Sequence, residues 1–314
     1  ADVHVLQVVL AGALDDDAVP LARARAAGAG GEAAGVGLDG GGDGGGGVLG
    51  HAASIGAGTD TTPGTRLWAN PPRAGPALAP HRPVRTLLRM PETARNRLLH
   101  DLPAVTVRTC SVSEMDNNVY LLTSKTTGAQ VLIDAADDAE AIRDLIASAA
   151  GDTPCEPRLE MIVTTHRHWD HVRALPALAS LTGARTAAGE DDADAIAEAT
   201  GVAPDVRLRH GDTVGADGLR LEVVALRGHT PGSIALVCRP EADEPAVLFT
   251  GDSLFPGGVG NTEGDDGRFR QLFTDVSDRI FDAFDDDVVV HPGHGASTTL
   301  GAERPHLPEW AERG

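Results

Sequence analysis

The segment T-T-H-R-H-W-D-H, residues Thr164–His171, follows an apolar run and places four candidate metal ligands within six residues. In an extended backbone His166 and His168 point the same way, because side chains repeat every two residues. Asp170 and His171 come one turn later and can face a second position. Three imidazoles and one carboxylate suit zinc, iron or manganese better than calcium. The segment therefore predicts a transition-metal site at the end of a buried strand.

Three motifs further along the chain supply partners for this cluster. Each places one potential ligand where a predicted strand ends: G-H-T-P-G-S contains His229, T-G-D-S contains Asp252, and P-G-H-G contains His294. Their glycines permit tight turns that aim a single side chain inwards. The four motifs, in this order, resemble the metallo-β-lactamase-fold hydrolase superfamily, and within it the hydroxyacylglutathione hydrolase (second glyoxalase) type. The resemblance covers residues 105–314.

The resemblance implies two metal positions. It assigns His166, His168 and His229 to the first ion and Asp170, His171 and His294 to the second, with Asp252 bridging both. It also implies that Asp134, at the end of another predicted strand, supports the site through a ligand. An aspartate that simply starts the next helix is the other interpretation of Asp134. His291 precedes the P-G-H-G motif, so we expect it to have a structural or supporting place beside the site.

The resemblance also implies a chemistry: two divalent ions that share a bridging hydroxide, with zinc as the first choice and iron or manganese as alternatives. Metal binding lowers the pKa of water from ~15.7 towards neutrality, so a nucleophile exists at pH 7. Asp170 would orient the hydroxide for attack on a thioester, lactone or similar acyl bond. Serine catalysis through Ser253 is disfavoured, because the histidines are already used as ligands. The alternative function is a mononuclear iron oxygenase acting on a thiol persulfide, which would need few second-site ligands.

The glycine-rich segment Leu254–Gly267 begins two residues after Asp252. We expect it to form one lip of the substrate cleft, with Phe255, Gly258 and Asn261 as candidate contacts. Deleting residues 256–260 should then change substrate preference or KM and leave metal content near normal. Hydroxyacylglutathione hydrolases carry a helical C-terminal domain that recognises glutathione, whereas 20 residues follow His294 here. Glutathione specificity is therefore not expected to carry over.

Charge and cysteine content restrict the class of protein. The chain has 46 acidic and 26 basic residues, and residues 105–314 hold 36 and 17 of them, a net charge of −19. Such a domain repels phosphate backbones, so we expect a small-molecule substrate rather than a nucleic acid. Three cysteines without a C-x-x-C pair fit a reducing cytoplasm. No apolar run predicts a membrane span or a signal peptide, and the oligomeric state is left open.

The first 89 residues differ in composition from the rest. Sixteen of the 38 glycines fall before residue 60, and residues 70–83 are rich in proline. Such a segment buries too little apolar surface to fold, so it predicts a low-complexity, disordered extension. One lysine against 25 arginines suggests a GC-rich gene. Residues 1–89 are then a candidate for non-native translation, with Met90 as the start.

For the rest of the chain, the sequence predicts a linker over residues 90–104 and a catalytic domain over residues 105–314. Strands fall in two batches, each near helices, which predicts an α/β (α+β) fold: an αββα sandwich of two mixed β-sheets flanked by helices. Helical spacing is expected over 137–150, over 172–181 with a bend near Pro176, and over 266–284. The site is expected at one edge between the sheets, where loops carry chemistry on a rigid frame.

Overall fold

The computed structural model describes residues 96–239 and 244–313. All of them belong to one compact unit that spans Pro80–Gly314. The predictions of a disordered extension over residues 1–89 and of a start at Met90 lie outside the described residues. Within the described part, no helix combines the length and the apolar character that crossing a membrane requires.

The first sheet has seven strands in chain order. Its first four strands pair antiparallel and its last four pair parallel, through crossover helices. The strands are β1 (Arg97–Asp101), β2 (Val105–Val112), β3 (Asn117–Ser124), β4 (Ala129–Ile133), β5 (Arg158–Thr164), β6 (Arg185–Gly189) and β7 (Val206–Leu208). The crossover helices are α2 (Ala139–Ser148), α3 (Leu175–Thr182) and α4 (Glu190–Thr200). All five residues of β4 are buried, as expected for a strand covered on both faces.

The second sheet has six strands in the order β15-β14-β11-β10-β9-β8. They are β8 (Thr213–Ala216), β9 (Leu219–Ala225), β10 (Ile234–Cys238), β11 (Val247–Gly251), β14 (Val289–Pro292) and β15 (Thr298–Thr299). A small hairpin, β12 (Leu254–Phe255) and β13 (Gly258–Val259), follows β11. The helices on this side are α5 (Asp266–Val276), α6 (Leu300–Glu303) and α7 (Leu307–Ala311).

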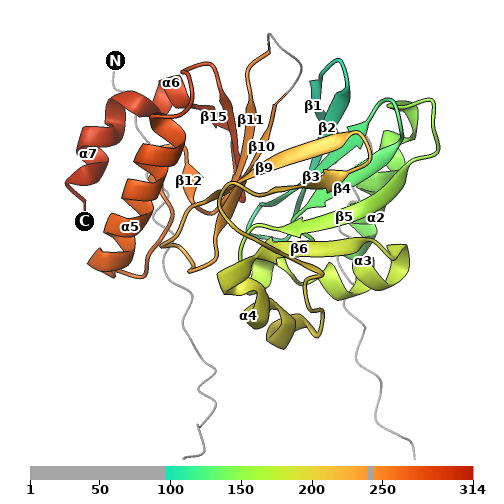
Figure 1. Cartoon of the computed structure of the whole chain (residues 1–314), viewed down its shortest axis with the longest axis horizontal. Helices are drawn as coiled ribbons and strands as arrows, with labels where there is room; N and C mark the ends of the chain where they lie inside the picture. The colour runs from blue at the N-terminus through green and yellow to red at the C-terminus, as the bar shows by residue number, and fades with distance from the viewer. Residues whose placement is uncertain (1–95, 240–243, 314) are drawn as a thin grey trace, which may run out of the picture. The chain divides into compact units, whose positions relative to one another are not determined.

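Three apolar layers hold these elements together. The first lies between the sheets and joins residues such as Val131 and Phe249. The second packs α2, α3 and α4 on the first sheet, and the third packs α5 and α7 on the second. Trp310 of α7 is 1% exposed, so the end of the described chain belongs to this third layer. The predicted αββα sandwich is therefore confirmed, as Figure 1 shows.

Three expectations differ from the structure. Residues 97–101, within the predicted linker, form β1, because they pair with β2 at the edge of the first sheet. The proline at 176 does not bend a helix: α3 starts at Leu175, and proline suits the first helical turn. The predicted helix over 266–284 is α5 followed by a π-helical turn, Ser277–Phe281.

The site is placed by strand direction. In the first sheet Asp134 follows β4 and the segment Thr164–His171 follows its parallel neighbour β5. In the second sheet Asp252 follows β11 and His294 follows the end of its parallel neighbour β14. Parallel neighbours end at the same edge of a sheet, so their following loops meet. His229 joins them from the loop between β9 and β10.

Candidate metal centre

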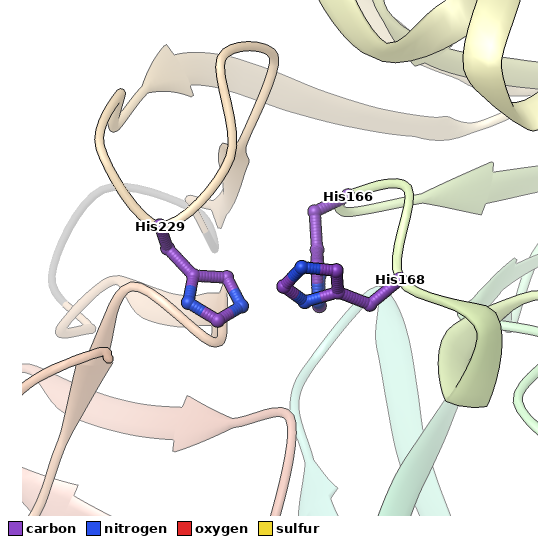
Figure 2. Close-up of side chains that lie close together, drawn as sticks. All are labelled: His166, His168 and His229. Carbon is purple, nitrogen blue, oxygen red and sulfur yellow. The ribbon is translucent and has the colours of Figure 1, made fainter. Parts of the chain in front are cut away.

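The structure brings all seven predicted ligands together in three overlapping groups. Within each group the ligand atoms lie within 4.8 Å of one another: His166 with His168 and His229, His166 with His171 and Asp252, and Asp170 with His171 and His294. Figure 2 shows His229 reaching from the β9–β10 loop towards His166 and His168, which come from the loop after β5. His166, His168 and His229 thus form one end of the cluster, and Asp170, His171 and His294 form the other.

Asp252 lies between the two ends. Its Oδ2 atom is 3.9 Å from His166 Nε2, 3.8 Å from His229 Nε2 and 3.3 Å from His294 Nε2. Its Oδ1 atom is 3.5 Å from Nε2 of His171. A carboxylate in this position can bridge two cations, either through one oxygen atom or with one oxygen atom on each cation.

Backbone carbonyls orient two of the imidazoles. His229 donates from Nδ1 to the carbonyl of Asn261 at 2.7 Å, and His294 donates from Nδ1 to the carbonyl of Met115 at 2.8 Å. A carbonyl oxygen only accepts, so Nδ1 carries the hydrogen of the neutral ring and Nε2 keeps its lone pair. Both Nε2 atoms face the cluster.

Asp134 orients the other buried imidazoles. Its Oδ2 atom accepts from His171 Nδ1 at 2.9 Å and from Thr165 Oγ1 at 2.8 Å. Thr165 Oγ1 in turn lies 3.0 Å from His166 Nδ1, which donates to it. The supporting place predicted for Asp134 therefore agrees with its contacts, and its φ of 60° matches a residue held by its surroundings.

The donor set fits a divalent cation. Nε2 of His166, Nε2 of His229 and Oδ1 of Asp252 are buried and have no hydrogen-bond partner. Burial lowers the pKa of both imidazoles, so they are neutral and present lone pairs. Unpartnered buried acceptors cost free energy unless something pairs them. Neutral nitrogen and carboxylate oxygen atoms that face one another are the ligands zinc and iron prefer.

The other end of the cluster carries charge. Burial opposes ionisation of His171 and His294, but the neighbouring carboxylates outweigh it. Asp134 and Asp252 raise the pKa of His171, while Asp170 and Asp252 raise the pKa of His294 to about 10. Burial also opposes the Asp170 and Asp252 anions, yet the neighbouring His171 and His294 imidazoles lower both carboxyl pKa values. The two Nε2 atoms lie 3.1 Å apart, so one proton fits between them and supplies positive charge where a cation would otherwise bind.

The family comparison agrees with this geometry. The family model described as the metallo-beta-lactamase superfamily matches residues 112–299, which include all seven ligands. The chain belongs to the metallo-β-lactamase superfamily. Among curated proteins, it is 30% identical over 166 residues to hydroxyacylglutathione hydrolase GloC of Haemophilus influenzae, covering 48% of this chain and 75% of that protein. It spans only 45% to 51% of the length of several other relatives.

Solved structures of the metallo-β-lactamase fold are also similar. ETHE1 from Myxococcus xanthus matches with a TM-score of 0.54 and 30% identity, over 66% of this chain and 84% of that one. The B3 metallo-β-lactamase BLEG-1 matches with a TM-score of 0.52 and 25% identity, over 65% of this chain and 98% of that one. Family and relatives together support a metal-dependent hydrolase, and the fold implies divalent metal ions.

Some residues that shape this metallo-β-lactamase site were not predicted. Asn117 is fully buried at the start of β3 and donates from Nδ2 to the Oδ2 atom of Asp170 at 3.0 Å. The same amide lies 3.4 Å from Nε2 of His294. The signal available in the sequence was a pair of asparagines, Asn117 and Asn118, directly before an apolar run. Thr165, inside the first motif, was visible but was given no role.

His291 does not touch the seven ligands through its described contacts. Its Nε2 atom is 2.7 Å from Nε2 of His100, and its Nδ1 atom is 2.6 Å from Oγ of Ser297. Its ring stacks on Phe249 within the layer between the sheets. Side chains alternate along β14, so His291 points into that layer while His294 turns towards the site beyond the strand end. Of the two places expected for it, the contacts favour the structural one.

The predicted substrate loop lies against the ligands. Phe255 and Gly258 pair across the β12–β13 hairpin, and Asn261 supplies the carbonyl that holds His229. At Gly260, a Cβ atom would lie 1.8 Å from the Asp252 carbonyl oxygen. The loop therefore supports the metal centre as well as bordering it. Contrary to the expectation from sequence, deletion of residues 256–260 should also lower metal content.

Proposed function

We propose that the protein hydrolyses a thioester, lactone or similar acyl bond with two divalent ions held by the seven ligands. The observation that carries this proposal is the set of imidazoles oriented through Nδ1, whose Nε2 atoms face the Asp252 carboxylate between them and, at one end, Asp170. The name of the Haemophilus relative, a hydroxyacylglutathione hydrolase, supports an acyl substrate. Zinc is our first choice of metal, with iron and manganese as alternatives.

The seven candidate ligands form two groups with separate roles. His166, His168 and His229 would hold one ion, and Asp170, His171 and His294 the other, with Asp252 shared between them. When bound, such ions supply water of lowered pKa and a Lewis acid for a carbonyl oxygen. Asn117 holds the Asp170 carboxylate at 3.0 Å, so that this carboxylate can orient water towards the acyl carbon. No serine or cysteine nucleophile is required.

An apolar rim beside the ligands suits an organic acyl or thiol group. Trp169 stands between His168 and Asp170 in the chain and is 56% exposed. Met115, whose carbonyl holds His294, is 45% exposed. The guanidinium of Arg173 lies 3.5 Å from the centre of the Trp169 ring and keeps that side chain in place. A small-molecule substrate could pack its apolar part on this rim.

The similarity to ETHE1 is also compatible with the alternative function from the sequence, a mononuclear iron oxygenase acting on a thiol persulfide. The structure favours the hydrolase, because the Asp170, His171 and His294 end of the cluster is complete. A site for one iron would leave those three residues without a ligand role.

The test is metal content per chain, measured together with hydrolysis of a thioester and lactone panel and with oxygen uptake on a persulfide. The proposal expects two equivalents of metal and hydrolysis without oxygen uptake. Asp252→Ala and His168→Ala should release metal and abolish hydrolysis. His306→Ala should do neither, because His306 is exposed beside Glu309. One iron per chain with oxygen uptake would establish the second function instead.

A further inference from the structure

The Asp192 carboxylate lies between two ligand loops. Asp192 occupies the first turn of α4 and is fully buried, at 0% exposure. Its Oδ2 atom accepts from the backbone N–H of Arg167 at 3.0 Å. The same oxygen accepts from the hydroxyl of Thr230, and Oδ1 accepts from the backbone N–H of Gly232 at 2.9 Å. One carboxylate thus receives hydrogen bonds from both loops.

These contacts flank the three histidines of the first metal position. Arg167 stands between His166 and His168, and Thr230 directly follows His229. The loop after β5 belongs to the first sheet, whereas the β9–β10 loop belongs to the second. The separation of His229 from the other two histidines therefore depends on how the two loops are joined.

The backbones of the β9–β10 loop and of the start of α4 lie so close together that the distance between them can change little. A Cβ atom at Gly232 would lie 2.3 Å from the backbone nitrogen of Asp192, and one at Gly189 would lie 2.0 Å from the Gly232 carbonyl oxygen. On its other side, the β9–β10 loop is hydrogen-bonded to α5, because Arg268 Nε donates to the Gly228 carbonyl at 2.8 Å. The loop is held from two directions, and Asp192 ties it to the His166–His168 loop.

We infer that Asp192 is a positioning residue that sets the distance between His229 and the His166–His168 pair, and with it the metal affinity of that triad. The inference rests on the metal centre of the proposed function and is independent of the substrate. A competing role is purely structural, because an acidic residue in the first turn stabilises a helix. The two roles differ in what happens to the metal when the protein stays folded.

The test is cobalt(II) titration of the full chain and of Asp192→Asn, followed by visible absorption. The asparagine keeps the side-chain size but can no longer accept hydrogen bonds at both positions. Loss of such a supporting contact typically weakens metal affinity about 10–100-fold. We expect a loss of that size for one cobalt equivalent, with the other equivalent unchanged. The spectrum of the remaining tight cobalt should match that of His229→Ala and differ from that of His294→Ala.

Asp152→Asn is the matched control for stability. Asp152 is a partly buried residue whose carboxylate also accepts from a threonine hydroxyl and an arginine, but its partners Thr106 and Arg108 lie on β2. This variant should lose stability and keep the wild-type cobalt titration. Thr230→Val gives a second test if Asp192→Asn does not fold, because it removes one hydrogen bond to Asp192 without removing the charge. It should weaken the same equivalent by about fivefold, the worth of one hydrogen bond.

An unchanged cobalt titration in Asp192→Asn would overturn the inference, and so would equal losses from both positions. If Asp152→Asn weakens cobalt binding as much, the effect is general destabilisation and the positioning role is wrong. If the wild type binds cobalt as described but hydrolyses no acyl substrate, the proposed function fails and the inference stands.

Discussion

At the residue scale, the group that holds Nδ1 decides the orientation of four of the five candidate ligand histidines. Carbonyls hold His229 and His294, a carboxylate holds His171, and a threonine hydroxyl holds His166. Each contact fixes the ring plane and directs Nε2 at the cluster. Loss of such an outer contact typically weakens metal affinity about 10–100-fold.

Replacement of Asp134 by asparagine tests this description. The change removes the charge that supports His171 and disturbs the hydrogen bond to Thr165, which orients His166. Zinc affinity should fall about 10–100-fold, measured by competition with a chromogenic chelator. Asp137→Asn is the control, because Asp137 pairs with Arg173 and is partly exposed. Equal zinc affinity in the Asp134 and Asp137 variants would contradict the role of Asp134.

The pH dependence of metal binding follows from His294. Burial opposes its charge, but Asp170 and Asp252 raise its pKa to about 10, so the metal-free protein carries this proton at neutral pH. A metal must displace the proton, because a ligating imidazole uses its lone pair. Apparent zinc affinity should therefore rise with pH, about tenfold per unit for each displaced proton, between pH 6 and 8. A pH-independent affinity over this range would refute the displacement.

At the element scale, an ion pair with hydrogen bonds fastens the α2 crossover to the first sheet, away from the metal centre. Asp152, beyond the end of α2, accepts from Arg108 Nε and Nη2 at 2.7 Å each and from Thr106 at 2.9 Å. Both partners lie on β2, so these bonds fasten the α2 crossover to the first sheet. Asp152 precedes β5, whereas the His166–His168 loop follows it, so we expect these bonds to contribute to the stability of the fold rather than to metal binding.

Asp152→Asn should destabilise the fold by about 1–2 kcal/mol at pH 7, the worth of a charge-assisted pair of hydrogen bonds. Burial opposes the Asp152 anion, but Arg108 and Thr106 lower its pKa below the ordinary value. The contribution is thus present above the unfolded pKa of about 3.9 and is lost as pH falls through the lower folded pKa. Urea unfolding of wild type and variant at pH 7, 5 and 3 should show the gap closing at pH 3. A constant gap would count against the carboxylate as its source.

At the scale of the whole molecule, the metal centre joins the two halves of the sandwich. His166, His168, Asp170 and His171 come from the first sheet's loops, while His229, Asp252 and His294 come from the second's. A bound ion therefore ties the sheets together at one edge, in addition to the apolar layer between them. The −19 charge of residues 105–314 is also partly neutralised when cations bind.

Metal removal should accordingly lower global stability. Free zinc at 100 times its dissociation constant should stabilise the folded chain by about 2.7 kcal/mol per site, if the unfolded chain binds none. Thermal unfolding with and without a chelator measures the difference, and hydrogen exchange should show the loss of protection in residues 164–171 and 226–232. His229→Ala with His294→Ala serves as the control and should lose the response to zinc. A full response in that double variant would contradict stabilisation through this centre.

The sandwich and the seven candidate ligands were predictable from sequence, as was a supporting role for Asp134, whereas the contacts of Asn117 and Thr165 were not. Motifs after apolar runs identify strand ends, and His and Asp are recognisable as ligands by their chemistry. His291 carries the same chemistry but points into the core, because strand alternation and packing decide its direction. Pro176 lies in the first turn of α3 and does not bend it, because the effect of a proline depends on where the helix starts.

The amino-acid sequence by itself determined which seven side chains could bind metal, in what order they occur and which strands precede them. These properties are local, since residue type and spacing carry them. The tertiary structure decided the distances across the cluster, the carbonyls that hold His229 and His294, and the place of Asp192 between two loops. Every residue has a backbone carbonyl, so residue type does not show which carbonyl will hold a histidine. Loops from different sheets come together only when the sheets pack.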